Sequence, residues 1–140
     1  MTGLFIDTSG WAAFLVRSEP FHDRATLLVE QARKNRWPIV TTNYVMTELV
    51  VLLTSPMRVP RREQVRIVET LRFANWIHIL HIGPEQDEAS WQLLATHDDK
   101  DWSLVDCASF IIMRERSIAT ALTNDRHFEQ AGFIRLLKDL

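Results

Sequence analysis

Four carboxylates of this chain stand where a metal-dependent hydrolase would carry them. Asp7 and Asp125 each follow a short apolar run that is typical of a buried strand, and Glu48 and Asp106 lie in apolar helical patterns. Burying a lone carboxylate among aliphatic side chains costs several kcal/mol unless a partner compensates its charge. Because each of the four acids would incur this free-energy cost if buried alone, we predict that they share a cation.

Three of these acids also have a simple structural explanation. Asp7 and Asp125 each directly precede a predicted helix, where an aspartate caps free backbone N–H groups. Asp106 follows Ser103 by three residues, which is the spacing of a capping box. Glu48 has no such role, because it lies about six residues into its helix and its neighbours four residues away are a tyrosine and a leucine. Glu48 therefore needs a partner from elsewhere in the fold, and it favours the shared metal site.

The chemistry of such a site follows from its ligands. A cluster made only of carboxylates selects a hard cation, Mg²⁺ or Mn²⁺, over zinc. One or two such ions, about 4 Å apart if there are two, activate water and neutralise the leaving oxygen of a phosphodiester. Without the metal, the carboxylates repel one another and at least one takes up a proton. We therefore expect a divalent ion to stabilise the fold.

Polar and basic side chains near the acids are candidates for substrate contacts. The hydroxyl and amide groups flanking the acids suit metal-bound water or phosphate, although they are also common turn residues. A run of arginines after the Glu48 helix suits a phosphodiester backbone, although a solvated helix face explains it equally well. Asp101 belongs either to a solvated loop or to the edge of the site. The candidate substrate-binding residues are Thr8, Ser9, Asn124, Arg58, Arg61 and Arg62.

Composition places the chain among ordinary globular domains. It has 140 residues, 46% of them hydrophobic and 24% charged, with a net charge of -2, so we expect a single domain over residues 1–140. No apolar run reaches the roughly 18 residues that span a bilayer, and no signal-like segment is expected at the N-terminus. The single cysteine, Cys107, suits a reducing cytoplasm and a small buried residue. The five histidines do not fall at paired zinc-ligand spacings.

Short strand patterns alternate with helical patterns along the whole chain. This order predicts an α/β fold with a mostly parallel central sheet, in which ligands bind beyond the carboxyl ends of the strands. The expected strands cover residues 4–6, 38–41, 76–82, 118–122 and 133–137. The expected helices cover residues 10–16, 22–34, a segment from 42 or 43 to about 54, 61–74, 85–96, 103–116 and 125–131.

Four segments of the chain resemble the PIN-domain family, and in particular the VapC-type ribonuclease toxins. The matching segments, in the order of the family, are Phe5-Ile6-Asp7-Thr8-Ser9, Thr47-Glu48-Leu49, Trp102-Ser103-Leu104-Val105-Asp106-Cys107-Ala108-Ser109-Phe110 and Ala121-Leu122-Thr123-Asn124-Asp125-Arg126-His127-Phe128. The acidic quartet of the family maps onto Asp7, Glu48, Asp106 and Asp125. Position 124 departs from the aromatic residue that close relatives often carry, which we interpret as a change in local contacts.

The resemblance implies a three-layer α/β/α PIN fold with Mg²⁺- or Mn²⁺-dependent endoribonuclease activity. It also implies a homodimer and a small antitoxin protein whose tail covers the site. The segment from residue 57 to 66 corresponds to a helical arm that is often involved in dimerisation or RNA contact.

Two other function classes remain open on the sequence alone. A non-catalytic PIN module would hold RNA or a partner without cutting it. A DNA-specific nuclease or a phosphatase would use the same acids on another substrate. A purely structural role is disfavoured by Glu48, and the RNA target is not predicted.

Overall fold

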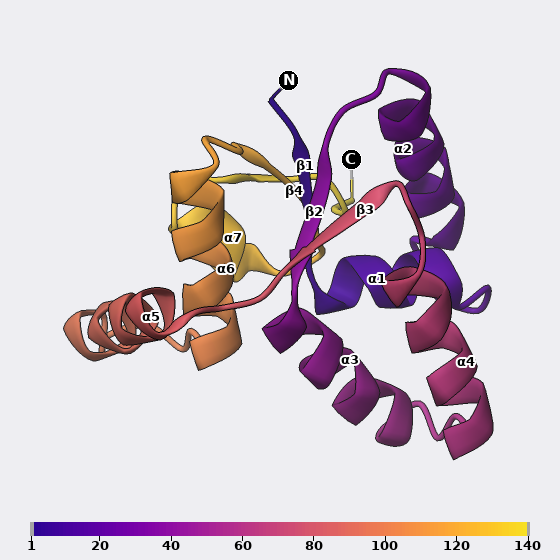
Figure 1. Cartoon of the computed structure of the whole chain (residues 1–140), viewed down its shortest axis with the longest axis horizontal. Helices are drawn as coiled ribbons and strands as arrows, with labels where there is room; N and C mark the ends of the chain where they lie inside the picture. Colours follow the sequence, from indigo (N-terminus) through magenta and orange to yellow (C-terminus); the bar gives the residue numbers. More distant parts are fainter. Residues whose placement is uncertain (1, 140) are drawn as a thin grey trace.

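A five-stranded sheet forms the centre of the computed structural model, which describes residues 2–139 (Figure 1). All neighbouring strands run parallel, in the order β3-β2-β1-β4-β5. The strands are β1 (Leu4–Ile6), β2 (Ile39–Thr42), β3 (Ile77–Leu80), β4 (Thr120–Leu122) and β5 (Ile134–Arg135). The three inner strands are buried along their whole length, as expected of strands that are covered on both faces.

Helices cover both faces of the sheet and give three layers. In Figure 1, α1, α2 and α4 lie on one side of the strands, and α5, α6 and α7 lie on the other. Helix α3 leaves the end of β2 and contacts both α1 and α6. The helices are α1 (Thr8–Leu15), α2 (His22–Lys34), α3 (Asn43–Thr54), α4 (Arg61–Arg72), α5 (Pro84–Thr96), α6 (Leu104–Glu115) and α7 (Arg126–Gln130).

The strand order creates a switch point next to β1. The chain places β2 and β3 on one side of β1, and then returns to place β4 and β5 on the other. Connections therefore leave the carboxyl ends of β1 and β4 in opposite directions, and a crevice opens between them. Asp7 directly follows β1, and Asp125 follows β4 by three positions, so the topology brings these two acids to the same edge.

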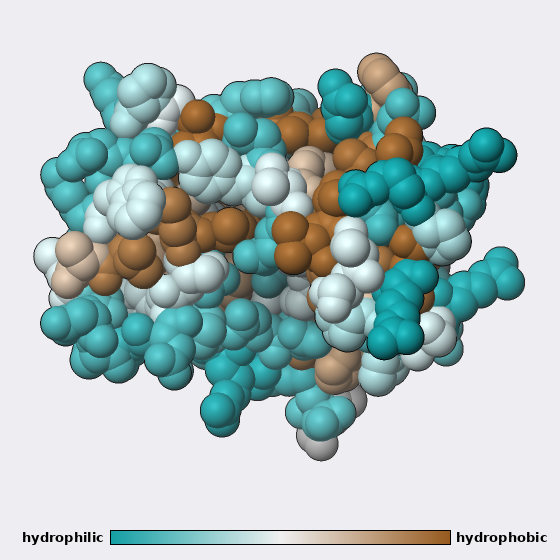
Figure 2. All heavy atoms as spheres, turned by 90° about the horizontal axis from the view of Figure 1, so that it is seen from below, coloured by the Kyte–Doolittle hydropathy of each residue, from teal (hydrophilic) through white to brown (hydrophobic). Residues whose placement is uncertain are grey.

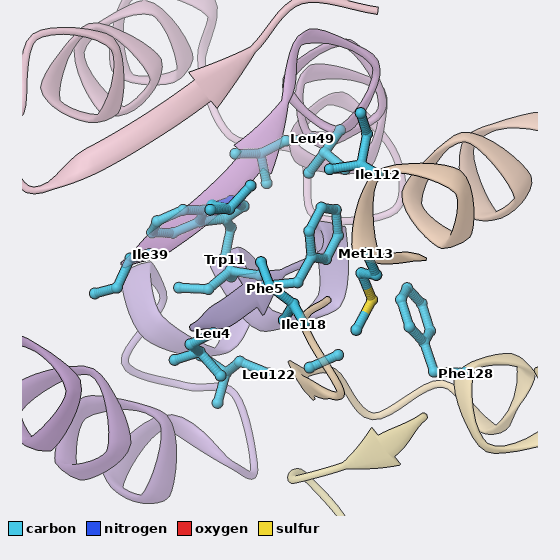
Figure 3. Packing of buried hydrophobic residues seen from close by; sticks show 14 of the residues in the cluster. Leu4, Phe5, Trp11, Ile39, Leu49, Ile112, Met113, Ile118, Leu122 and Phe128 are labelled. Atoms are coloured by element: carbon cyan, nitrogen blue, oxygen red, sulfur yellow. The ribbon is translucent and has the colours of Figure 1, made fainter. Parts of the chain in front are cut away.

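The hydrophobic core lies between the sheet and its helices (Figure 3). Phe5 of β1 and Phe128 of α7 are fully buried, with ring centroids 6.4 Å apart. Trp11 of α1 is fully buried as well, and its indole N–H donates to Thr41 Oγ1 at 3.1 Å. Large buried side chains on both faces thus fix the strands that carry the site.

The expected α/β/α fold is confirmed, and the element boundaries differ from expectation only at their ends. Strands β3, β4 and β5 are shorter than predicted, and β2 begins and ends one residue later than predicted. Helix α1 begins at Thr8, two residues earlier than predicted, because the Asp7 side chain caps it. Within residues 2–139, none of the helices has the length and apolarity required to cross a membrane.

Candidate metal centre

Asp7 joins the ends of β1 and β4. Its Oδ1 accepts hydrogen bonds from the backbone N–H of Gly10 at 2.9 Å and from Ser9 Oγ at 2.8 Å. Its Oδ2 accepts from Thr123 Oγ1 at 2.7 Å. The predicted capping role is therefore real, but the second oxygen faces the neighbouring strand. Asp7 caps a helix and belongs to a polar cluster at the switch point.

Side chains of this polar cluster also bind the backbone of the segment that follows β4. The Thr123 hydroxyl accepts from the backbone N–H of Asp125 at 3.0 Å, and Ser9 Oγ accepts from the backbone N–H of Asn124 at 3.0 Å. Asp125 then caps α7 by accepting from the backbone N–H of His127 at 2.9 Å. Hydroxyls from both sides of the crevice thus hold the backbone of residues 124 and 125, from which the Asp125 side chain projects.

Gly10 allows the two strand ends to come this close. A Cβ atom at this position would lie 2.0 Å from the carbonyl oxygen of Leu122 and 2.9 Å from an Ile6 methyl group. No side chain fits there without a shift of the backbone. The glycine therefore lets the first turn of α1 pack directly against the end of β4.

Asp106 reaches the site from α6. Its backbone N–H donates to Ser103 Oγ at 3.0 Å, and its Oδ2 accepts from the Ser103 N–H at 3.0 Å, so the predicted capping box is present. The same Oδ2 lies 2.9 Å from Nδ1 of His127. Asp106, like Asp7, therefore caps a helix and also belongs to the polar cluster, because a carboxylate has several acceptor positions.

Glu48 reaches the site from α3 and finds its partner in another element. The hydroxyl of Thr8 donates to Glu48 Oε1 at 2.5 Å. This contact meets the expectation that Glu48 needs a partner from elsewhere in the fold. It also ties α3 to the first residue of α1, beside Asp7.

Burial, assisted by neighbouring carboxylates, raises the pKa of Asp7, Glu48 and Asp106. Burial raises the pKa of Asp7 to about 7, although hydrogen bonds from Thr123, Gly10 and Ser9 oppose the shift, and the charge of Asp125 adds to it. Burial also raises the pKa of Glu48, with further contributions from Asp106 and Asp125. Asp106 likewise has a raised pKa, mainly through burial. A cation would relieve this cost.

The donors suit a divalent metal ion. Asp106, Asp125 and His127 each offer one ligand atom, and these atoms lie within 4.8 Å of one another. Asp7 and Glu48 are tied into the cluster by the hydroxyls of Thr123 and Thr8. Carboxylate oxygens and an imidazole nitrogen are ligands for divalent cations, and a cation would offset the burial that raises the pKa of Asp7, Glu48 and Asp106.

The predicted substrate-binding residues divide into two groups. Thr8, Ser9 and Asn124 lie in the hydrogen-bond network of the acids. The exposed arginines 58, 61 and 62 lie instead at the connection between α3 and α4, at the end of α3 opposite to its start beside β2 (Figure 1). The contact of these arginines with RNA therefore stays a prediction.

Two residues contribute more to the site than their sequence patterns predict. The histidines lack paired zinc-ligand spacings, yet the ring of His127 lies between Asp106 and Asp125. Asp101, whose sequence context fits either a solvated loop or the edge of the site, lines a hollow of about 520 Å³ together with Asp125 and His127. The Asp-x-His spacing after β4 is the sequence feature that indicates a role for His127 at the site.

Cys107 is buried, and burial raises the pKa of its thiol to about 11, which argues against a nucleophile.

An apolar groove opens beside Glu48. It has a volume of about 440 Å³ and is lined by Tyr44, Thr47, Glu48, Val51 and Val105, so it lies between α3 and α6. Figure 2 views the molecule from this end, where hydrophobic atoms are exposed between hydrophilic margins. Glu48 therefore borders a surface groove with room for a ligand.

Known proteins of one family resemble this chain in sequence and in fold. The PIN domain family matches residues 4–134. The 23S rRNA-specific endonuclease VapC20 of Mycobacterium tuberculosis is 31% identical over 134 residues, which cover 95% of this chain and 97% of the relative. Its crystal structure, described as that of a Sarcin-Ricin loop cleaving toxin, superposes with a TM-score of 0.80 at 29% identity, covering 94% and 97% of the two chains.

A second solved structure shares the fold alone. FitAcB from Neisseria gonorrhoeae superposes with a TM-score of 0.66 at 15% identity, covering 96% of each chain. The family match spans residues 4–134, nearly the whole chain. The chain therefore belongs to the PIN-domain family.

Proposed function

We propose that this protein is a Mg²⁺- or Mn²⁺-dependent endoribonuclease and the toxin of a toxin–antitoxin pair. The observation that carries the proposal is the convergence of four acids from four parts of the chain at the switch point of the sheet, where burial raises the pKa of Asp7, Glu48 and Asp106. The similarity to a VapC endonuclease supports hydrolysis of RNA. The catalytic and metal-binding residues in this proposal are Asp7, Glu48, Asp106 and Asp125.

Each residue has a defined part in the proposed reaction. The acids would hold the metal directly or through water, and the chemistry supplied there would be a water of lowered pKa and neutralisation of charge on the scissile phosphate. Thr8 keeps the Glu48 carboxylate in place, and Thr123 does the same for Asp7. Ser9 and Asn124 belong to the hydrogen-bond network of the acids and would contact metal-bound water or phosphate, while the arginines 58, 61 and 62 would bind the RNA backbone farther away.

The substrate and the partners follow from the relatives. VapC20 is named as specific for 23S rRNA, so a structured ribosomal RNA loop is the first substrate to test. We propose that residues 1–140 form one domain that acts in the cytoplasm as a homodimer, and that a small antitoxin protein covers the acids when the toxin is silent.

Cleavage of a labelled hairpin carrying the sarcin–ricin loop tests the proposal. With Mn²⁺ the protein should cut the hairpin at a discrete position, and EDTA or Asp106→Asn should abolish the product. Asp98→Asn removes a charge from the exposed loop after α5 and should leave the rate unchanged.

The other function classes predict different outcomes. Metal-independent binding of the hairpin without any product would support a non-catalytic module. Faster cleavage of single-stranded DNA or of a phosphomonoester would support another substrate class. Cleavage that survives Asp106→Asn would refute the assignment of the site.

A further inference from the structure

The ring of His127 lies between two of the proposed metal ligands. Its Nδ1 is 2.9 Å from Asp106 Oδ2 and 3.3 Å from Asp125 Oδ1. All three ligand atoms lie within 4.8 Å of one another. The three side chains come from α6, from the residue that caps α7, and from α7 itself.

The two separations from His127 Nδ1 are compatible with the geometry of an octahedral ion. Neighbouring ligands of an octahedral ion with bonds of about 2.1 Å lie about 3.0 Å apart. The two distances from Nδ1 are close to that edge length. An ion coordinated by the three atoms would therefore need little rearrangement of the side chains.

The backbone holds this arrangement in place. Asp125 accepts from the N–H of His127, so the residue that caps α7 also fixes the start of the helix that carries the ring. The Ser103 N–H holds Asp106 Oδ2. The His127 side chain is 27% exposed, and the hollow of about 520 Å³ beside it also borders Asp125 and Asp101, which gives an ion a route from solvent.

We propose that His127 Nδ1 is a direct ligand of the metal, together with carboxylate oxygens of Asp106 and Asp125. This inference rests on the metal site of the proposed function and adds a nitrogen donor to a site that was predicted from carboxylates alone. Imidazole suits transition-metal ions, whereas Mg²⁺ prefers oxygen and gives up its water reluctantly. The site is therefore selective for Mn²⁺ over Mg²⁺.

Electron spin echo envelope modulation of the Mn²⁺-loaded protein tests the ligand directly, because it detects an imidazole ¹⁴N bound to Mn²⁺. The wild-type protein should show this modulation, and His127→Gln should lose it. The same variant should bind Mn²⁺ roughly tenfold or more weakly in calorimetry, whereas its affinity for Mg²⁺ should change little. His78→Gln removes an exposed histidine of β3 and should behave as wild type.

Two results would overturn the assignment. If the wild-type protein binds Mn²⁺ without ¹⁴N modulation, His127 acts only through its hydrogen bond to Asp106. If His127→Gln weakens Mn²⁺ and Mg²⁺ equally, the imidazole does not select the metal. Far-UV circular dichroism of the variant, recorded without metal, separates loss of the ligand from loss of the fold.

Hairpin cleavage measured on the same samples keeps this inference distinct from the proposed function. Nitrogen modulation without cleavage supports the ligand and refutes the substrate. Cleavage without modulation supports the nuclease and refutes the ligand.

Discussion

Two carboxylates of this protein, those of Asp7 and Asp106, each cap a helix and also belong to the candidate metal site. These two roles are usually considered as alternatives. Asp7 caps α1 with one oxygen and faces β4 with the other. Asp106 completes a capping box and also contacts His127. A carboxylate offers about four lone-pair positions, so satisfying a helix end leaves capacity for a cation. A capping explanation for an acid is therefore no argument against a metal site.

The raised pKa of Asp7 predicts how stability depends on pH in the absence of metal. The group ionises near 3.8 when unfolded and at about 7 when folded, so the folded protein binds more protons between these values. The free energy of unfolding should then fall as the pH rises from about 4 to 7, by up to about 4 kcal/mol from this group. The raised pKa values of Glu48 and Asp106 act in the same direction.

Thermal melts of Asp7→Asn in EDTA check this prediction. Asparagine still caps the helix but has no charge to bury, so at pH 8 the variant should melt at a higher temperature than the wild type. The difference should shrink toward pH 4, and Mn²⁺ should stabilise the wild type more than the variant. Asp98→Asn, in the exposed loop, should follow the wild-type curve. Parallel curves for wild type and Asp7→Asn at all pH values would contradict the raised pKa.

At the scale of elements, the site depends on how closely α1 approaches β4. The first turn of α1 carries Thr8 and Ser9, which bond to Glu48 and Asp7. The end of β4 carries Thr123, which bonds to Asp7. The contacts across the crevice exist only because Gly10 has no side chain.

Gly10→Ala should therefore destabilise the protein and disturb the site. The new Cβ would meet the Leu122 carbonyl at 2.0 Å, and the forced shift should cost about 1 to 3 kcal/mol of unfolding free energy. Urea denaturation measures this loss, and a weaker Mn²⁺-induced rise in melting temperature reports the disturbed ligands.

Gly83→Ala provides the matched control. Its added Cβ has no neighbour closer than 3.9 Å, so the variant should lose only the roughly 0.5 kcal/mol by which an N-cap position such as Gly83 prefers glycine over alanine. Equal losses in the two variants would show that close packing at Gly10 is unimportant.

At the scale of the whole molecule, charge is unevenly distributed. The net charge is only -2, yet four acids converge at the switch point and exposed arginines border the connection between α3 and α4. A polyanion is repelled by the acids until a metal is bound, so its attraction must come from elsewhere on the surface. The arginines 58, 61 and 62 are the proposed source.

Replacing Arg61 and Arg62 with glutamate should weaken RNA binding without changing the metal site. The slope of log K against log salt should fall by about 1 for each phosphate contact that is lost, while the Mn²⁺ affinity stays at the wild-type value. Fluorescence anisotropy over a salt series measures the slope. Lys34→Glu, at the far end of α2, makes half that charge change and should leave the slope close to wild type. An unchanged slope in the arginine variant would place the RNA contact elsewhere.

We can recognise from the sequence alone the alternation of strands and helices, the capping residues and the four acids. These features depend on local periodicity and on side chains that bond to nearby backbone, so a short window of residues contains them. The need of Glu48 for a distant partner also followed from its position in an apolar helix, and Thr8 meets that need.

The contacts between these residues, in contrast, become visible in the tertiary structure. The place of β4 beside β1, the close packing at Gly10 and the position of His127 between Asp106 and Asp125 depend on residues that are distant in the sequence. The raised pKa of Asp7 likewise results from burial by other elements. A sequence pattern gives the type and the order of donors, whereas the distances between them arise when the sheet brings its strand ends together.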